Sequence, residues 1–222
     1  MVGASKRGKR RAVHRGVELV CSTRFEEEAR AAGHRVIAGV DEVGRGALCG
    51  PVVAAAVVLG ADFEAEGLDD SKRLTARQRE ALDVRIREQA RAFAIGVADH
   101  DEIDRLNILR ATLVAMKRAV LALPVAPDLL LVDALRVPGL DVEQQAIVKG
   151  DAQSVSIAAA SIVAKVTRDA LMRELDRAHP GYELASNMGY GSEEHRLALR
   201  RLGPSRIHRR TFFGTTQAWL FS

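Results

Sequence analysis

The chain has only two cysteines, Cys21 and Cys49, and they stand far apart from one another. This excludes a disulfide framework and gives no zinc-ligand spacing, so we expect reduced thiols in a cytoplasmic protein. Aromatic residues make up only 4% of the chain, which predicts a mostly aliphatic core. No apolar stretch approaches a membrane span, and the basic start of the chain lacks the apolar segment of a secretory signal. We therefore expect no membrane contact.

Acidic residues are missing from both ends of the chain. Residues 1–15 carry six Lys or Arg, and residues 196–222 carry six Arg. Removing these twelve from the 33 basic residues leaves 21 against 29 acidic ones, so the middle of the chain has a net charge of −8. Basic ends suit contact with phosphate backbones, although a solvated tail is the favoured interpretation of residues 1–15.

The hydrophobic pattern predicts one α/β domain, and 222 residues suffice for a sizeable core. Capping boxes at Thr23–Glu26 and Thr75–Gln78 predict two helix starts. The remaining expected elements are a β-hairpin over 36–59, strands over 93–98, 129–133 and 144–148, and helices over 101–123, 154–179 and 193–202. Together these predict a mixed five-stranded sheet flanked by helices, with a small C-terminal helical appendage.

The apolar run from Val36 to Val40 ends in two adjacent carboxylates, Asp41 and Glu42, and Gly44-Arg45-Gly46 follows. The run is short, β-branched and bounded by glycine, which is typical of a buried strand. Carboxylates at the end of a buried strand are costly unless a cation is bound there. The alternative is an acidic strand end followed by an ordinary glycine turn.

Two further carboxylates follow predicted strands. Asp133 ends the strand over 129–133, and Asp151 comes shortly after the strand over 144–148. Ligand sites in open α/β sheets gather at such strand ends. Four carboxylates without His or Cys match hard cations such as Mg²⁺ or Mn²⁺, and two such ions promote phosphodiester cleavage. Capping or loop roles for Asp133 and Asp151 are the alternative, but the pair at 41–42 favours the metal site.

Long motifs in the same order resemble the ribonuclease HII family over about residues 23–213. They are Asp-Glu-x-Gly-Arg-Gly at 41–46, Gly-Pro-Val-Val-Ala-Ala-Ala-Val at 50–57, Asp-Ser-Lys-Arg-Leu at 70–74, the stretch 103–116, and the run 149–169. The resemblance implies a ribonuclease H-like fold and endonucleolytic cleavage of RNA in RNA–DNA hybrids. It also implies incision 5′ of single ribonucleotides embedded in duplex DNA, leaving 5′-phosphate and 3′-hydroxyl ends.

The resemblance also implies the site residues. Asp41, Glu42, Asp133 and Asp151 are the expected catalytic metal ligands for two Mn²⁺ or Mg²⁺ ions, with Asp41 bridging both. Gly44, Arg45 and Gly46 are expected to present backbone groups to the ribose 2′-hydroxyl. Tyr190, between two glycines, is expected to read the RNA–DNA junction, although a simple turn tyrosine is the alternative. Further expected phosphate contacts are Lys72, Ser154, Ser156 and Lys165. For Ser156 the alternative is packing of the helix against the sheet. For Ser161 that packing role is the favoured interpretation.

We divide the chain into a basic tail (1–22), a catalytic domain (23–180) and a C-terminal substrate-contact segment (181–222). The sequence departs from the family at Ala134-Leu135, where many relatives have Gly-Asn, and at Met188, where Lys is common. Residues 217–221 only faintly resemble a sliding-clamp peptide, so we expect a monomer without clamp binding, in which Trp219 packs on the domain. The alternative functions are a junction resolvase, a DEDD exonuclease, or a nucleic-acid-binding protein with a degenerate site.

Overall fold

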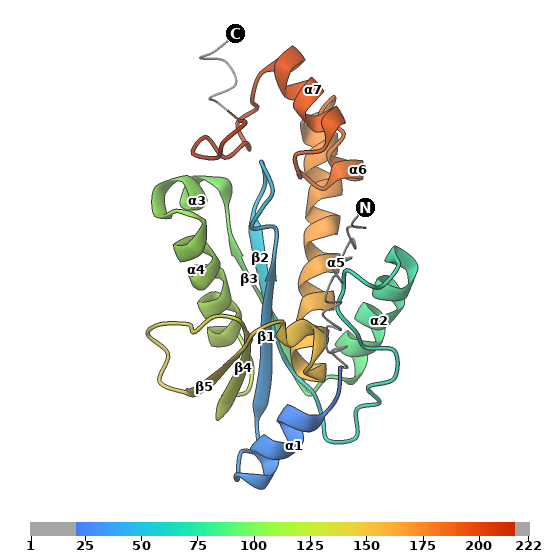
Figure 1. The fold of residues 1–222 in the computed structure, drawn as a ribbon, viewed down its shortest axis with the longest axis vertical. Helices are drawn as coiled ribbons and strands as arrows, with labels where there is room; N and C mark the ends of the chain where they lie inside the picture. The colour runs from blue at the N-terminus through green and yellow to red at the C-terminus, as the bar shows by residue number, and fades with distance from the viewer. Residues whose placement is uncertain (1–20, 216–222) are drawn as a thin grey trace, which may run out of the picture.

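The computed structural model describes residues 21–215, and a five-stranded mixed sheet forms its centre (Figure 1). The strands are β1 (Ile37–Val43), β2 (Val52–Val58), β3 (Ala92–Ala98), β4 (Leu129–Asp133) and β5 (Glu143–Ile147), in the order β3-β2-β1-β4-β5. The first three strands pair antiparallel, whereas β4 runs parallel to both β1 and β5. The predicted hairpin and mixed sheet are confirmed.

Helices cover both faces of this sheet. α4 (Ile108–Leu121) packs on one face, and α5 (Val155–Ala178) with α2 (Ala76–Gln89) packs on the other (Figure 1). The core is mostly aliphatic, as the low aromatic content predicts. Two glycines allow close approach of the helices, because a Cβ at Gly39 would meet the backbone of Ser156 and one at Gly96 would meet that of Ala115. The close fit at Gly39 places the start of α5 directly against β1.

The helix predicted over 101–123 is two helices in the structure. α3 (His100–Leu106) ends at Asn107, and α4 begins directly after it. Asn107 has a positive φ of 69° with an extended ψ of 162°, a backbone conformation that interrupts a helix. Its side chain accepts a hydrogen bond from the backbone N–H of Arg110 and so caps α4.

The capping box predicted at Thr23 is also wrong. α1 (Arg24–Ala31) begins there, but the Thr23 side chain forms no cap and instead donates to Glu27. Glu26 turns inward, and its Oε1 accepts hydrogen bonds from Ser154 Oγ (2.6 Å) and the Ser156 N–H (2.9 Å). The buried carboxylate therefore joins α1 to the start of α5. The second capping box, at Thr75, is confirmed.

The chain after α5 packs on the loop that joins β1 to β2. α6 (Leu184–Asn187) and α7 (Glu193–Leu202) enclose a small apolar cluster with Leu48, Cys49 and Met172 (Figure 1). His208 then forms an antiparallel bridge with Cys49. Among the described residues, no helix is both long and apolar enough to cross a membrane. Residues 1–15 and 217–221, including Trp219, lie outside the described part of the chain.

Candidate metal centre and the loops beside it

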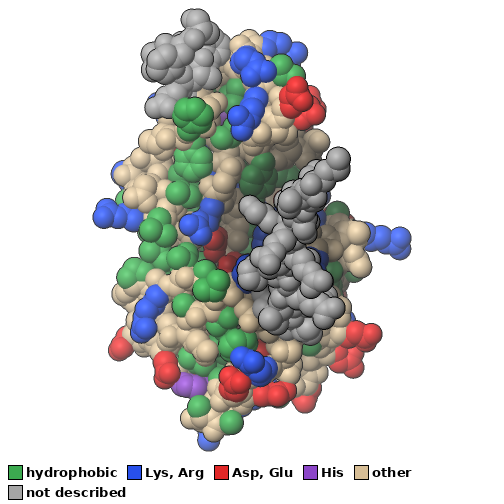
Figure 2. Space-filling model, in the orientation of Figure 1, with side chains coloured by type: hydrophobic (Ala, Val, Ile, Leu, Met, Phe, Trp, Pro, Cys, Tyr) green, Lys and Arg blue, Asp and Glu red, His purple; other side chains and the backbone are tan. Residues whose placement is uncertain are grey.

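The predicted carboxylates lie at the ends of neighbouring strands. β1 and β4 run parallel with Val40 opposite Val132, so Asp41 and Asp133 follow at adjacent positions. Asp151 belongs to a short 3₁₀ helix, η1 (Gly150–Ala152), and the N–H of Gly150 donates to Asp133 Oδ1 at 2.7 Å. Figure 2 shows acidic side chains in a hollow near the middle of one face, with basic side chains beside them.

Burial and mutual repulsion raise the pKa values of Asp41, Glu42 and Asp133. Burial raises the pKa of Asp41 well above its ordinary value, and the charges of Glu42 and Asp133 add to it. Burial also raises the pKa of Glu42, although Arg45 opposes the change. The pKa of Asp133 is raised by burial too, with a contribution from Asp151. The site therefore concentrates negative charge where solvent stabilises it poorly.

Two basic side chains partly neutralise this charge. Lys72 Nζ lies 2.8 Å from Asp151 Oδ2 and 3.4 Å from Asp70 Oδ1. Arg45 Nη1 lies 3.1 Å from Glu42 Oε1. The other oxygen of Glu42, Oε2, is buried and has no hydrogen-bond partner within residues 21–215. An unpartnered carboxylate oxygen in an all-oxygen donor set fits a hard divalent cation.

The carboxylates do not converge as tightly as a second cluster in the chain. In the described part, the group of ligand atoms that all lie within 4.8 Å of one another comes from Cys49, His195 and His208. Burial raises the pKa of the Cys49 thiol to about 12, which disfavours the thiolate that metals bind. The metal prediction therefore rests on the charge and donor chemistry of the carboxylates rather than on a closed set of ligands.

Hydrogen bonds use all four ring nitrogens of the two histidines. The N–H of Ser205 donates to His208 Nδ1 (3.0 Å), so neutral His208 carries its proton on Nε2. That atom lies 3.0 Å from His195 Nε2, which accepts, and His195 Nδ1 donates to the carbonyl of Tyr190 (2.9 Å). The pair therefore forms an ordered chain of hydrogen bonds between residues 205 and 190.

The structure brings the two predicted substrate-reading segments together. Gly44, Arg45 and Gly46 open the loop after β1, and Leu48 in this loop donates its N–H to the carbonyl of Gly189 at 2.8 Å. Tyr190 is 36% exposed, and the Arg168 guanidinium lies over its ring at 5.5 Å. A glycine-rich loop and a partly exposed tyrosine thus share one surface.

The predicted phosphate contacts are distributed differently. Lys72 lies at the carboxylates, but Ser154 and Ser156 are 0% and 1% exposed, and they bind Glu26 instead. Lys165 Nζ lies 2.7 Å from Asp169 Oδ1 on α5. Ser154 and Ser156 therefore have no exposed side chain for a phosphate, whereas Lys72 and Lys165 remain partly exposed.

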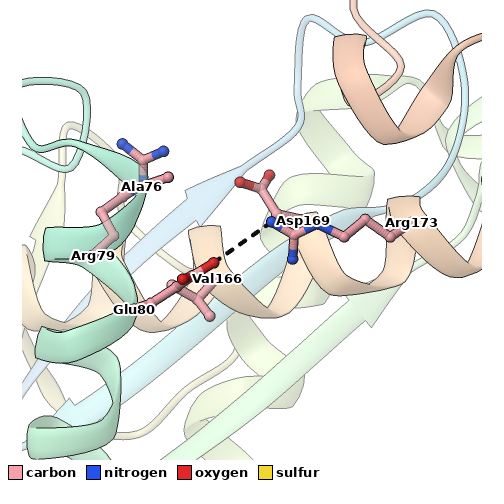
Figure 3. Close-up of a pocket in the computed structure, with 6 residues that line it drawn as sticks. All are labelled: Ala76, Arg79, Glu80, Val166, Asp169 and Arg173. Carbon is pink, nitrogen blue, oxygen red and sulfur yellow. Dashed lines mark ion pairs between the residues drawn. The ribbon is translucent and has the colours of Figure 1, made fainter.

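Asp169 also lines a shallow pocket between α2 and α5 (Figure 3). An ion pair between Arg173 and Glu80, 3.7 Å long, spans this pocket. Its volume of about 10 Å³ holds roughly one water molecule. The pocket is therefore no second substrate site.

Sequence reasoning missed several residues around the site. The hydroxyl of Ser161, a residue expected only to pack, opposes the rise in the pKa of Asp41, and it lies 2.9 Å from the hydroxyl of Ser71. The sequence signal for Ser161 was a polar residue within the small, apolar first half of α5. Arg168 and Arg209 are both fully buried, which a charged residue type does not suggest.

Comparisons with known proteins identify the family and the fold. A family model described as "Ribonuclease HII" matches residues 38–215. Ribonuclease HII of Geobacter sulfurreducens is 55% identical over 193 residues, covering 87% of this chain and 89% of that protein. The crystal structure of ribonuclease H2 from Pyrococcus horikoshii OT3 matches with a TM-score of 0.69 and 27% identity, over 82% of this chain and 96% of that one. The ribonuclease H-like fold is confirmed.

A structure of the PCNA:RNase HII complex from Archaeoglobus fulgidus matches with a TM-score of 0.58 and 24% identity, covering 75% of this chain and 88% of that chain. At this identity the match shows the fold alone. It leaves the prediction about a sliding clamp untested for this chain. The family model and the relative of 55% identity, by contrast, each cover most of the described residues. The chain belongs to the ribonuclease HII family and is a ribonuclease H.

Proposed function

We propose that this ribonuclease H, beyond cleaving RNA in RNA–DNA hybrids, incises duplex DNA on the 5′ side of a single embedded ribonucleotide. The products carry 5′-phosphate and 3′-hydroxyl ends. Asp41, Glu42, Asp133 and Asp151 hold two Mg²⁺ or Mn²⁺ ions for this reaction. When bound, such ions activate water and stabilise the leaving oxygen.

The observation that carries the metal assignment is the unpartnered Glu42 Oε2 among carboxylates with raised pKa values. Buried polar atoms in proteins nearly always have a partner, so this oxygen suits a ligand that binds with the substrate. As the family resemblance implies, Asp41 would be the ligand that both ions share, and the charges of both Glu42 and Asp133 act on it. The hydroxyl of Ser161 lowers the pKa of Asp41 and so favours its charged form.

Recognition of the ribonucleotide is assigned to the loop after β1 and to Tyr190. The backbone N–H groups of Arg45 and Gly46 bind the 2′-hydroxyl that distinguishes RNA from DNA. The ring of Tyr190 stacks on the deoxyribose that follows the ribonucleotide. Both come from elements joined by the bond between Leu48 and Gly189. Within the C-terminal segment (181–222), the described residues 181–215 thus contribute substrate contacts, with the protein acting as a monomer.

Digestion of a duplex that contains one ribonucleotide tests this function against the alternatives. With Mg²⁺ or Mn²⁺ we expect one incision per duplex, and EDTA should abolish it. A junction resolvase would instead cut a four-way junction, and a DEDD exonuclease would degrade the duplex from its ends. Failure to cut any of these substrates would indicate a nucleic-acid-binding protein with an inactive site.

A further inference from the structure

Two fully buried guanidinium groups lie beneath the loop that joins β1 to β2. Arg209 donates to the carbonyls of Gly44 (2.7 Å), Arg45 (2.9 Å) and Gly50 (3.0 Å). Arg168 donates to the carbonyls of Pro51 (2.9 Å) and Cys49 (3.3 Å), and to Met188 on the neighbouring segment (2.8 Å). Within residues 21–215 neither arginine forms an ion pair with a carboxylate.

Burial without a counter-charge is costly, and it lowers the pKa of Arg209 to about 9, with the nearby charge of Arg168 contributing. An apolar side chain could fill the same space without this cost. The planar guanidinium of Arg209, unlike an apolar side chain, donates hydrogen bonds that fix the direction of three carbonyl groups at once. The arrangement therefore points to a need for a defined loop conformation.

The direction of the carbonyls fixes the direction of the amides. In a planar trans peptide the N–H of the next residue points opposite to the C=O, and the described chain has no cis peptide bond. The bonds from Arg209 therefore turn the N–H groups of Arg45 and Gly46 away from the buried guanidinium. Arg45 and Gly46 are exposed, and neither N–H donates to any group in the described chain.

We propose that Arg209 is a positioning residue for ribonucleotide selectivity. It does not touch the substrate. By holding the carbonyls of Gly44 and Arg45, it presents two consecutive amides, those of Arg45 and Gly46, to the oxygen of a ribose 2′-hydroxyl. The assignment rests on the proposed function, because it explains how the same loop distinguishes ribose from deoxyribose.

The backbone around Arg209 supports this role. The N–H of Arg209 donates to the carbonyl of Leu48 (2.9 Å), and the N–H of Gly50 donates to the carbonyl of Ile207 (3.0 Å). Thr215 Oγ1 donates to the carbonyl of Arg209. Arg209 is therefore anchored to the loop through its backbone and its side chain, and its head group has little freedom to move.

The test is the ratio of two dissociation constants, measured in EDTA so that no cleavage occurs. One duplex contains a single ribonucleotide, and the other has the same sequence in DNA only. Arg209→Lys keeps the charge but loses the fork, so we expect the preference for the ribonucleotide duplex to fall about tenfold, as for two misaligned hydrogen bonds. Binding of the DNA duplex should not change. Arg177→Lys, an exposed arginine at the end of α5, is the matched control and should keep the full preference.

A second variant separates positioning from folding. Arg209→Ala leaves a space shaped for guanidinium, so guanidinium ion well below denaturing concentration should restore the preference, whereas equal KCl should not. If wild type shows no preference, the loop does not read the 2′-hydroxyl, and this part of the proposed function fails together with the positioning role. If wild type discriminates and Arg209→Lys discriminates equally, the positioning role is wrong. Equal weakening on both duplexes, without rescue of Arg209→Ala by guanidinium, would also overturn it.

Discussion

The ammonium group of Lys72 lies 2.8 Å from Oδ2 of Asp151, a proposed metal ligand. Although partial burial lowers the pKa of Lys72, the hydrogen bond to Asp151 and the nearby carboxylates raise it above the ordinary value. Lys72 is therefore charged at any physiological pH. In the metal-free protein it supplies positive charge that a divalent cation supplies when bound, so the two compete for the same carboxylate.

Lys72→Gln should bind Mn²⁺ more tightly than wild type in the absence of substrate. Removing one unit charge near the site is expected to change the dissociation constant by about tenfold, or ~1.4 kcal/mol. Calorimetric titration with Mn²⁺ measures this. Arg73→Gln is the control, because Arg73 is half-exposed and pairs with Asp69 instead. Unchanged or weaker Mn²⁺ binding by Lys72→Gln would show that the ammonium does not compete.

Asp41→Asn should abolish cleavage and leave the fold intact. It removes the proposed bridging ligand, and it also removes a buried charge that repels Glu42 and Asp133. A raised carboxylate pKa means that stability is greatest at low pH and is lost as the pH rises through the folded-state value. The neutral Asn side chain does not titrate, so the variant does not lose stability in this way. At neutral pH in EDTA it should therefore unfold at a temperature at least equal to that of wild type. Near-normal turnover would contradict the assignment of Asp41.

The histidine pair predicts a pH-dependent stability. Burial lowers the pKa of His208 from 6.5 to about 4, with the charge of His195 also contributing, and burial lowers that of His195 as well. The folded protein then binds fewer protons than the unfolded chain between these pH values. The stabilisation is complete above about pH 6.5 and is lost as the pH falls toward about 4, by on the order of 3 kcal/mol.

Denaturant unfolding of wild type and His208→Gln at several pH values measures this effect as a difference. The raised pKa values of the carboxylates act in the opposite direction, but they are common to both proteins and cancel. We expect the advantage of wild type over the variant to shrink as the solution is acidified below pH 6.5, the ordinary value for His208. A constant advantage would mean that His208 binds a proton in the folded protein as readily as in the unfolded chain.

Tyr190→Ala should reduce selectivity more than chemistry. Loss of the ring removes a stacking contact with the sugar after the ribonucleotide, worth about 1–3 kcal/mol by analogy with base–aromatic stacking. A uniform RNA–DNA hybrid offers no deoxyribose there, so kcat/KM should fall more on the single-ribonucleotide duplex than on the hybrid. Phe213→Ala is the control, since Phe213 is an aromatic of the same segment that is 84% exposed. Equal losses on both substrates would make Tyr190 a general binding or packing residue.

The sequence allowed prediction of the sheet and of the carboxylates, because both follow from local pattern. The apolar run of β2, Val-Val-Ala-Ala-Ala-Val-Val, is buried throughout. Asp133 ends β4, in which the four preceding residues are also buried. The break at Asn107 was missed because apolar residues recur at helical spacing through both α3 and α4. At Asn107 the capping side chain and the positive φ override the periodicity.

Contacts between distant segments could not be predicted from one sequence. Glu26 binds Ser154 across 128 positions, and Arg209 binds Gly44 across 165. Charged residues such as Glu26 and Arg209 are expected to be exposed, and only their contacts in the folded chain explain why they are buried. The departure at Ala134 acquires a physical meaning in the structure, since its φ of 52° lies in the region where the glycine of many relatives is unstrained.

The most direct test of the central claim is to map, at nucleotide resolution, where wild type cuts a duplex with one ribonucleotide. With Mg²⁺ or Mn²⁺ we expect a single incision on the 5′ side of that ribonucleotide, with 5′-phosphate and 3′-hydroxyl ends, and none in EDTA or with Asp41→Asn. Incision on the 3′ side with a cyclic 2′,3′-phosphate, or cutting that persists in EDTA, would contradict the proposed carboxylate-bound metal site.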